Sequence, residues 1–256
     1  MSSLLALLSP AKLIDDQTHY PNIPCSTPQF IDEAHYLVKK LRSLSPEQLT
    51  QILDISSKLA QETQQRHMNW QTPFSHQNAH PAIMMFQGEV YRGLKANELN
   101  SKQLQYANKH IKILSGLYGI LRPLDWAMPY RLMMGTRFEV DSKTPNLYTY
   151  WQQKISTHIK QATKPNDCII NLASQEYFKC IDVRVLERRI ISCEFKEKKG
   201  SSYAIVSTYA KLARGSMARF LIDHSIKNVP DIKAFNYENY QFNKHLSNES
   251  IFVFTR

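Results

Sequence analysis

Glycine is scarce in this sequence, with seven residues among 256. The glycine-rich signatures that hold a nucleotide phosphate, GxxxxGK[ST] and GxGxxG, do not occur, and neither does the GxSxG turn that presents a nucleophilic serine. The sequence therefore excludes the commonest nucleotide-binding and serine-hydrolase motifs. The few glycines that remain mark positions where the backbone turns tightly or approaches another group closely.

Cysteine is also sparse, and its spacing does not suit metal or redox chemistry. The four cysteines are separated by 143, 12 and 13 residues, so no CxxC pair exists: Cys25, Cys168, Cys180 and Cys193. We expect isolated and mostly buried thiols. Cys180, next to Lys179, is the one candidate for an oxidant sensor, because a neighbouring cation favours the thiolate.

Long apolar runs are missing as well. The longest run near the N-terminus, residues 4–8, is far shorter than the roughly 20 residues that a membrane span requires. No basic segment precedes it and no small-residue cleavage site follows it, so we expect a cytoplasmic protein without membrane contact.

His76 and His80 lack a third ligand, and neither a metal nor another cofactor is expected.

Acidic residues do not balance basic ones beyond residue 60. Residues 1–60 hold 5 Lys and Arg against 6 Asp and Glu, whereas the remainder holds 27 against 16. Residues 179–220 alone carry 10 basic and 4 acidic side chains. Such asymmetry attracts anions over a Debye length of about 8–10 Å. It favours a polyanionic partner, nucleic acid above all; a generic solvated basic surface is the alternative.

Hydrophobic periodicity predicts strands mixed with helices along one continuous chain. Strands are expected at 4–8, 83–86, 168–172 and 251–254, with a hairpin of residues 187–195 and 202–208. Helices are expected at 29–43, 45 to about 66, 101–114, 147–162 and 209–225, the second and third with N-terminal caps at Ser45 and Asn100. Because neither a regular βαβ rhythm nor a linker is visible, we predict a single α+β domain over 1–256, with a mixed sheet flanked by helices.

Gly116 and Gly119 directly follow the predicted 101–114 helix. A helix, a tight glycine turn and a second short helix would make a helix-hairpin-helix-like element, whose turn amides can hold a phosphate. The alternative is an ordinary helix C-cap followed by a turn.

Arginine and aromatic side chains alternate just beyond that turn: Arg122, Trp126, Tyr130, Arg131, Arg137 and Phe138. A guanidinium grips a phosphate with two parallel hydrogen bonds, and an aromatic ring stacks on an exposed base. The arrangement is therefore typical of a nucleic-acid contact. The alternative places the aromatic rings in the core and pairs the arginines with Asp125 or Glu139.

The predicted 209–225 helix carries cations on one side. At 100° per residue, Lys211, Arg214 and Arg219 fall within a sector of about 140°, and apolar side chains lie opposite. One face would pack on the protein and the other would present three cations to an anion. A helix face that is merely solvated is the alternative.

Two predicted strands are followed at once by polar side chains. Lys12 comes soon after the first strand, and Glu176 and Lys179 follow the strand at 168–172. Site residues are common at the ends of strands, so these three could converge. Glu176 and Lys179 would then be an acid/base pair, or else an ordinary ion pair three residues apart on a helix.

Several longer motifs, taken together, resemble the bacterial YaaA family over residues 4 to 254, nearly the whole chain. They are Ser9-Pro-Ala-Lys12, Gly88-Glu-Val-Tyr-Arg-Gly-Leu94, Leu114-Ser-Gly-Leu-Tyr-Gly-Ile-Leu-Arg-Pro-Leu-Asp125, Pro129-Tyr-Arg-Leu-Met-Met-Gly135, Asn171-Leu-Ala-Ser174 with Glu176-Tyr-Phe-Lys179, and Tyr209-Ala-Lys-Leu-Ala-Arg-Gly215. The resemblance implies a cytoplasmic DNA-binding protein of the peroxide stress response, linked to limiting free iron. It also implies an α+β fold with a helix-hairpin-helix-like element.

The leading hypothesis is therefore a protein that binds duplex or structured DNA through phosphates, with little sequence specificity. The residues expected at that interface are Lys12, Gly116, Gly119, Arg122, Arg131, Arg137, Lys179, Lys211, Arg214 and Arg219. The competing hypothesis is an enzyme acting on a nucleotide or nucleic acid, with Lys12, Glu176 and Lys179 at its site. A third is an interaction protein whose basic face meets an acidic partner. No particular protein partner follows from the sequence.

Overall fold

A computed structural model describes residues 3–15, 20 and 23–256. Within those residues the main sheet has eight strands, in the order β11-β12-β9-β8-β1-β5-β6, with β10 paired to β9. The strands are β1 (Leu4–Leu8), β5 (Ile111–Ser115), β6 (Gly119–Leu121), β8 (Cys168–Asn171), β9 (Arg189–Lys199), β10 (Ser202–Ala204), β11 (Gln241–Phe242) and β12 (Ile251–Thr255). Two short antiparallel pairs stand apart from it, β2 (Leu13–Ile14) with β4 (Phe86–Gln87) and β3 (His80–Pro81) with β7 (Trp126–Ala127).

The inner strands of the sheet run parallel, and β1 lies among them. It pairs with β5 on one side and β8 on the other, so that Leu7 is opposite both Lys112 and Asn171. All five residues of β1 are buried, as expected for a parallel strand covered on both faces. Antiparallel partners β6, β10 and β11 complete the sheet. The mixed α+β architecture is therefore confirmed.

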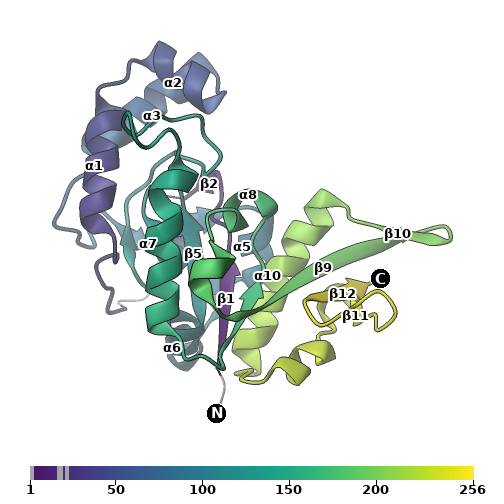
Figure 1. The fold of residues 1–256 in the computed structure, drawn as a ribbon. Coiled ribbons are helices and arrows are strands. Elements are labelled where there is room, and N and C mark those ends of the chain that lie inside the picture. Colours follow the sequence, from purple (N-terminus) through teal and green to yellow (C-terminus); the bar gives the residue numbers. More distant parts are fainter. Residues whose placement is uncertain (1–2, 16–19, 21–22) are drawn as a thin grey trace.

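Helices surround this sheet (Figure 1), with α1, α2 and α3 along one flank and the long β9–β10 hairpin reaching out on the other. In front of the sheet lies α7, which contacts β6, and α10 packs along α5. The helices are α1 (Ile31–Arg42), α2 (Pro46–Leu53), α3 (Ser57–Asn69), α4 (Ala82–Met85), α5 (Glu89–Leu94), α6 (Ser101–His110), α7 (Leu147–Ala162), α8 (Gln175–Phe178), α9 (Val183–Leu186) and α10 (Ser207–Asp223), with short 3₁₀ turns at Ala96–Glu98, Val229–Ala234 and Tyr237–Asn239.

Local signals predicted several of these elements correctly. The Ser45 hydroxyl accepts the Gln48 amide at 3.3 Å while the Gln48 side chain accepts the Ser45 amide at 2.8 Å, which is the expected capping box. Asn100 and Gln103 make the same reciprocal pair at the start of α6. The strands at β1, β8 and β12, the helices α1, α7 and α10, and the β9–β10 hairpin also lie where the sequence predicts them.

Three predicted elements are wrong. The helix expected to run to about residue 66 is interrupted at Asp54, whose φ of 52° is left-handed, and so becomes α2 and α3. The expected strand at 83–86 is mostly the short helix α4. The helix expected at 101–114 ends at His110, and residues 111–115 are strand β5 instead. The break at Asp54 is local, because the Ser56 hydroxyl caps the start of α3, whereas α4 and β5 are buried segments in which tertiary packing overrides the local pattern.

The expected helix-hairpin-helix is also wrong, because residues 111–121 form a β-hairpin of β5 and β6. Gly119 supplies the turn's positive φ of 68°, and a Cβ there would lie 2.6 Å from the Trp151 ring. A Cβ on Gly116 would lie 2.2 Å from the Leu132 carbonyl oxygen. Both glycines therefore serve close packing in the interior, and the residues between them, Leu117 and Tyr118, are fully buried.

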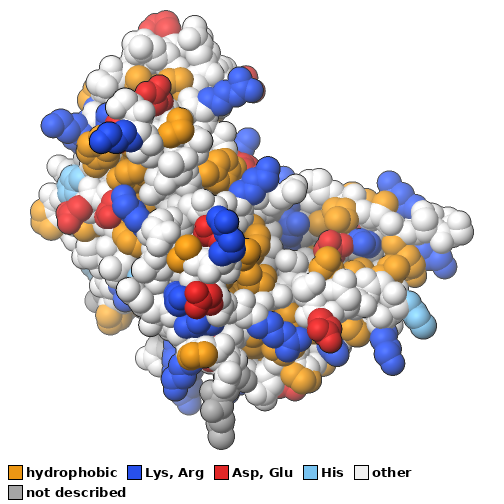
Figure 2. Space-filling model, in the orientation of Figure 1, with side chains coloured by type: hydrophobic (Ala, Val, Ile, Leu, Met, Phe, Trp, Pro, Cys, Tyr) orange, Lys and Arg blue, Asp and Glu red, His pale blue; other side chains and the backbone are white. Residues whose placement is uncertain are grey.

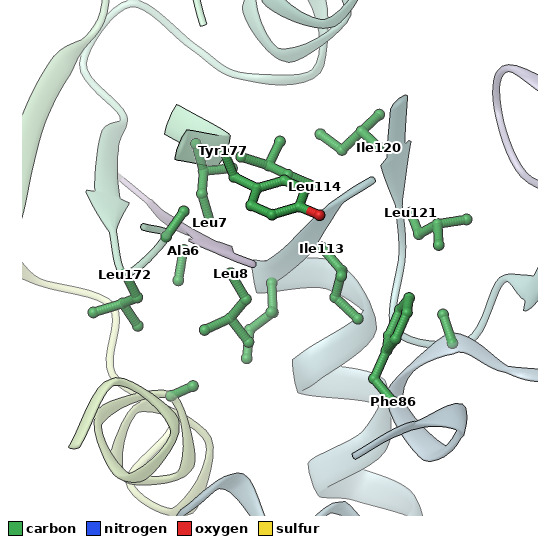
Figure 3. Close-up of a cluster of buried hydrophobic side chains, with 14 of the residues drawn as sticks. Ala6, Leu7, Leu8, Phe86, Ile113, Leu114, Ile120, Leu121, Leu172 and Tyr177 are labelled. Atoms are coloured by element: carbon green, nitrogen blue, oxygen red, sulfur yellow. The ribbon is translucent and has the colours of Figure 1, made fainter. Parts of the chain in front are cut away.

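The core between the sheet and its helices is drawn in Figure 3. Leu7 and Leu8 of β1, Ile113 of β5 and Leu121 of β6 are fully buried there. Tyr177 of α8, only 7% exposed, belongs to the same cluster. The loops that follow β1 and β8 thus start from the buried core.

Candidate nucleic-acid interface

A cavity of about 350 Å³ opens at the carboxyl ends of β1 and β8. Its walls come from the loop after β1, the corner between β4 and α5, the loop and α8 that follow β8, and the first turns of α10. The topology explains its place. The chain continues from β1 toward β5 on one side and from β8 to β9 on the other, and a crevice opens where two neighbouring strands diverge in this way.

Hydrogen bonds hold the two strand ends together at the base of the cavity. The Ser174 amide donates to the Ser9 hydroxyl at 2.8 Å, and the two hydroxyls lie 3.3 Å apart. The Tyr91 hydroxyl of α5 donates to the Ser9 carbonyl at 3.1 Å. Burial raises the pKa of Tyr91 well above its ordinary value, so this phenol stays a neutral donor. Three segments are thereby fixed relative to one another.

Two glycines bring α10 against the cavity. A Cβ on Gly215 would lie 1.7 Å from the Val90 carbonyl oxygen, and one on Gly93 would lie 2.2 Å from the Leu212 carbonyl oxygen. Only glycine at each position lets α5 and α10 cross so closely. The crossing sets Val90 of α5 beside Lys211 and Arg214 of α10 on the cavity wall.

Three predicted cations, from two distant parts of the chain, meet at this cavity: Lys12, Lys211 and Arg214. Lys12 and Lys211 are exposed, and Arg214 is half-buried. Among the described residues, Arg214 makes no ion pair and its Nε has no hydrogen-bond partner. Burial lowers the pKa of Arg214, because the charged form loses hydration that nothing fully replaces. The Arg214 guanidinium therefore has charge and an N–H donor available to bind an anion.

Two carboxylates share the wall with these cations. Glu176 accepts the Gly135 amide at 3.1 Å through Oε1. Glu89 pairs with Arg92 at 2.6 Å and forms no ion pair with Lys12 or Arg214. Lys12 and Glu176 therefore converge, as the strand-end argument predicted. Glu89 was not among the predicted site residues, although its position beside Gly88, whose φ is 104°, could have pointed to it.

A second, more open hollow of about 440 Å³ continues from the first. The two share Lys12, Met133 and Glu176, and the second adds Arg137 and the α2 end at Asp54. Figure 2 shows this side of the molecule hollowed between the α2 flank and the β9–β10 hairpin, with Lys and Arg side chains on both sides. The expected cations Lys12, Arg137, Lys211 and Arg214 therefore line one continuous concave surface, which we call the cleft.

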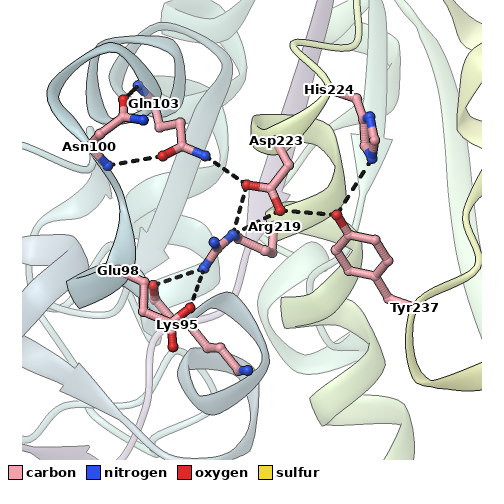
Figure 4. Close-up of polar contacts among 8 residues, drawn as sticks. All are labelled: Lys95, Glu98, Asn100, Gln103, Arg219, Asp223, His224 and Tyr237. Atoms are coloured by element: carbon pink, nitrogen blue, oxygen red, sulfur yellow. Dashed lines mark hydrogen bonds and ion pairs between the residues drawn. The ribbon is translucent and has the colours of Figure 1, made fainter.

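Arg219, the third cation of the predicted helix face, does not line the cleft hollows. Its guanidinium lies 2.8 Å from Asp223 and 3.0 Å from Glu98, and it also donates to the Lys95 carbonyl. Asp223 in turn accepts from Gln103 and from Tyr237 (Figure 4). This network joins α6, α10 and the C-terminal turns, so Arg219 is a structural cation.

The other predicted residues lie outside the cleft hollows. Arg122 pairs with the buried Asp125 at 2.9 Å. The three aromatic rings of that segment lie in the core: Trp126, Tyr130 and Phe138. For Arg122 and these rings, the alternative of core packing and an ion pair with Asp125 therefore holds. Arg131 is half-buried. Lys179, the C-cap residue of α8, is exposed, does not line the cavity and forms no ion pair with Glu176.

The thiols lack the surroundings of an oxidant sensor. Cys180, the candidate named from sequence, is fully buried, and burial raises its pKa, so the thiolate is disfavoured despite Lys179. Burial likewise raises the pKa of Cys25 and Cys168 to about 11 and that of Cys193 to about 12. In the described part of the chain, no three His, Cys, Asp or Glu side chains gather as metal ligands would, and no helix is long and apolar enough to cross a membrane.

Comparison with known proteins confirms the family resemblance. The family model described as peroxide stress protein YaaA matches residues 4–246. The chain belongs to this family. A UPF0246 protein of Neisseria gonorrhoeae is 42% identical over 252 residues, covering 98% of this chain and 97% of the relative. A UPF0246 protein of Idiomarina loihiensis is 43% identical over 255 residues, covering 99% and 98%. The description of the family supports a role in peroxide stress.

Proposed function

We propose that this protein binds DNA through the phosphate backbone and that this is its molecular activity in the peroxide stress response. The observation that carries the proposal is Arg214, a half-buried guanidinium on the cavity wall without an ion pair among the described residues. Partial burial of such an unpaired charge costs desolvation free energy, which a bound anion would offset. Lys12, Lys211 and Arg137 extend the same positive potential along the cleft.

A polyanion suits this surface better than a single small anion does. The cations are spread over two adjoining hollows, so successive phosphates of one strand could reach them. Contacts to phosphates alone give little sequence specificity. The family resemblance adds a link to limiting free iron, which we propose as a cellular outcome of DNA binding, measurable as free intracellular iron in a deletion strain.

The direct test measures fluorescence anisotropy of labelled duplexes of unrelated sequence over a range of salt. Replacing Lys12, Lys211 and Arg214 together by Gln removes about three phosphate contacts and should reduce the slope of log K against log salt by about 2.7. A matched control replaces Lys102 and Lys109 of α6 and Lys227 after α10, which are exposed and line neither hollow of the cleft. If the control weakens binding as much as the cleft variant does, general charge and not the cleft explains the affinity.

A second candidate function is chemistry on a nucleotide or nucleic acid. The observation in its favour is the convergence of Lys12 and Glu176 on one cavity at the ends of parallel strands. Lys179 is not part of that lining. The test incubates the protein with end-labelled DNA and with free nucleotides and analyses the products. Turnover that Glu176→Gln abolishes while binding persists would establish an enzyme.

A further inference from the structure

We infer that the cavity receives a single unstacked nucleotide, with its base against the apolar part of the wall and its phosphate on Lys12, Lys211 and Arg214. This inference rests on the proposed function, and it names what the cavity binds when DNA occupies the cleft. A nucleobase can reach such a site only after it leaves the helical stack, as it does in proteins that flip bases.

The walls of the cavity do not suit a phosphate. Apolar side chains from four segments face it: Pro10, Ala11, Val90, Met133, Leu172 and Tyr177. A phosphate would lose its hydration against such walls without gaining hydrogen bonds. The flat, weakly hydrated part of a nucleic acid is the base, and apolar and aromatic walls are the usual environment of an extruded one. The cations Lys12, Lys211 and Arg214 belong to the same lining and would hold the phosphate of that nucleotide.

Glu176 gives a second reason for a base in the cavity. A carboxylate repels phosphate, so its presence among three cations works against a site for phosphate alone. It is, however, a good acceptor for the amino and ring N–H groups of a base, as in contacts between Glu and the cytosine amino group. Its Oε1 is positioned by the Gly135 amide at 3.1 Å. The Gln87 side chain and the Ser174 hydroxyl on the same wall can complete the contacts to a base edge.

The size of the cavity agrees with this assignment. Its volume of about 350 Å³ lies at the small end of the 300–1,000 Å³ that is usual for small-molecule sites. A duplex cannot enter and would have to lie across the mouth, in the more open hollow that ends at Arg137. One nucleotide, turned out from that duplex or supplied free in solution, is the unit that fits.

The experiment follows 2-aminopurine, a base analogue whose emission rises when it unstacks, placed in a duplex at a mismatch. Wild-type protein should give a several-fold rise in emission on binding. Val90→Trp fills the cavity and should abolish the rise even at protein concentrations that saturate the duplex, with saturation followed by anisotropy in the same titration. Val183→Trp, at an exposed position on α9, is the matched control and should change neither quantity. If Val90→Trp fails to fold, Met133→Trp fills the same space from another segment.

A second arm separates the two sources of a nucleotide and separates this inference from the proposed function. Nucleoside monophosphates and inorganic phosphate are titrated against wild type and Val90→Trp. If DNA binds without any rise in emission, or with the same rise in the filled variant, the inference is overturned and DNA binding stands. If DNA does not bind, monophosphate binding that the filled variant loses supports a free-nucleotide site. Inorganic phosphate binding as tightly as the monophosphates would overturn the inference in either case.

Discussion

Two arginines of α10 lie in opposite surroundings. Near the middle of the helix, Arg214 is half-buried on the cavity wall without an ion pair among the described residues. One and a half turns later, Arg219 is neutralised by Asp223 and Glu98. The difference shows that an arginine is available to a ligand only where the neighbouring elements provide no carboxylate to pair with it. The net charge of a helix face does not show which of its arginines are paired.

The largest effect is expected from a change that separates α5 and α10, because their close crossing positions both Arg214 and Arg219. In Gly215→Ala, the new methyl group would meet the Val90 carbonyl oxygen at 1.7 Å and two further backbone atoms, so α5 and α10 must separate. We expect a loss of about 3 kcal/mol or more in the free energy of unfolding, together with weaker DNA binding. Thermal denaturation followed by circular dichroism measures the first quantity.

The control for that change is Gly200→Ala in the β9–β10 turn, where no atom lies within 4 Å of the added methyl. Only its φ of 61° is unfavourable, which costs about 1–2 kcal/mol. A Gly215→Ala protein as stable as wild type would show that the close crossing is not required, and the cleft would need another explanation.

How far the sequence anticipates this molecule depends on the range of each interaction. The caps at Ser45 and Asn100 were predictable because both partners lie within four residues. Lys12 and Glu176 could be placed together because the carboxyl ends of neighbouring parallel strands meet. By contrast, residues 111–115 continue a helical segment in sequence and become β5 only because β1 is beside them. The partner of Arg219, Glu98, is 121 residues away and no local pattern points to it.

The next largest effect is expected when Arg219, the ion-paired arginine of α10, is replaced. Arg219→Gln leaves Asp223 and Glu98 without their counter-charge, and we expect a loss of about 2 kcal/mol, reduced from the value for a fully buried pair because Glu98 is half-exposed. The salt slope of DNA binding should stay at the wild-type value. Arg184→Gln, which removes an exposed pair with Asp182, should leave the melting temperature unchanged. A reduced salt slope in Arg219→Gln would place this residue at the DNA after all.

The opposite pattern is expected for Arg214. Replacing it by Gln removes a charge that the protein itself does not compensate, so the free energy of unfolding should change by less than about 1 kcal/mol. The slope of log K against log salt should fall by about 0.9, equally for all sequences. A loss of several kcal/mol in stability would reveal a structural role, and the contrast between Arg214 and Arg219 would disappear.

The smallest effects are expected for Lys12 and Lys179, two lysines that the sequence analysis predicts at the interface by the same argument. Lys12 and Lys179 each follow a strand of the sheet and both are exposed, but only Lys12 lines the two hollows of the cleft. Lys12→Gln should therefore lower the salt slope by about 0.9, whereas Lys179→Gln should leave it unchanged. Because both substitutions remove one charge from the same end of the sheet, long-range electrostatics is matched between them and only direct contact differs. Equal slopes for the two variants, measured by anisotropy in parallel titrations, would mean that DNA lies over α8 as well, and the interface would be wider than the cleft.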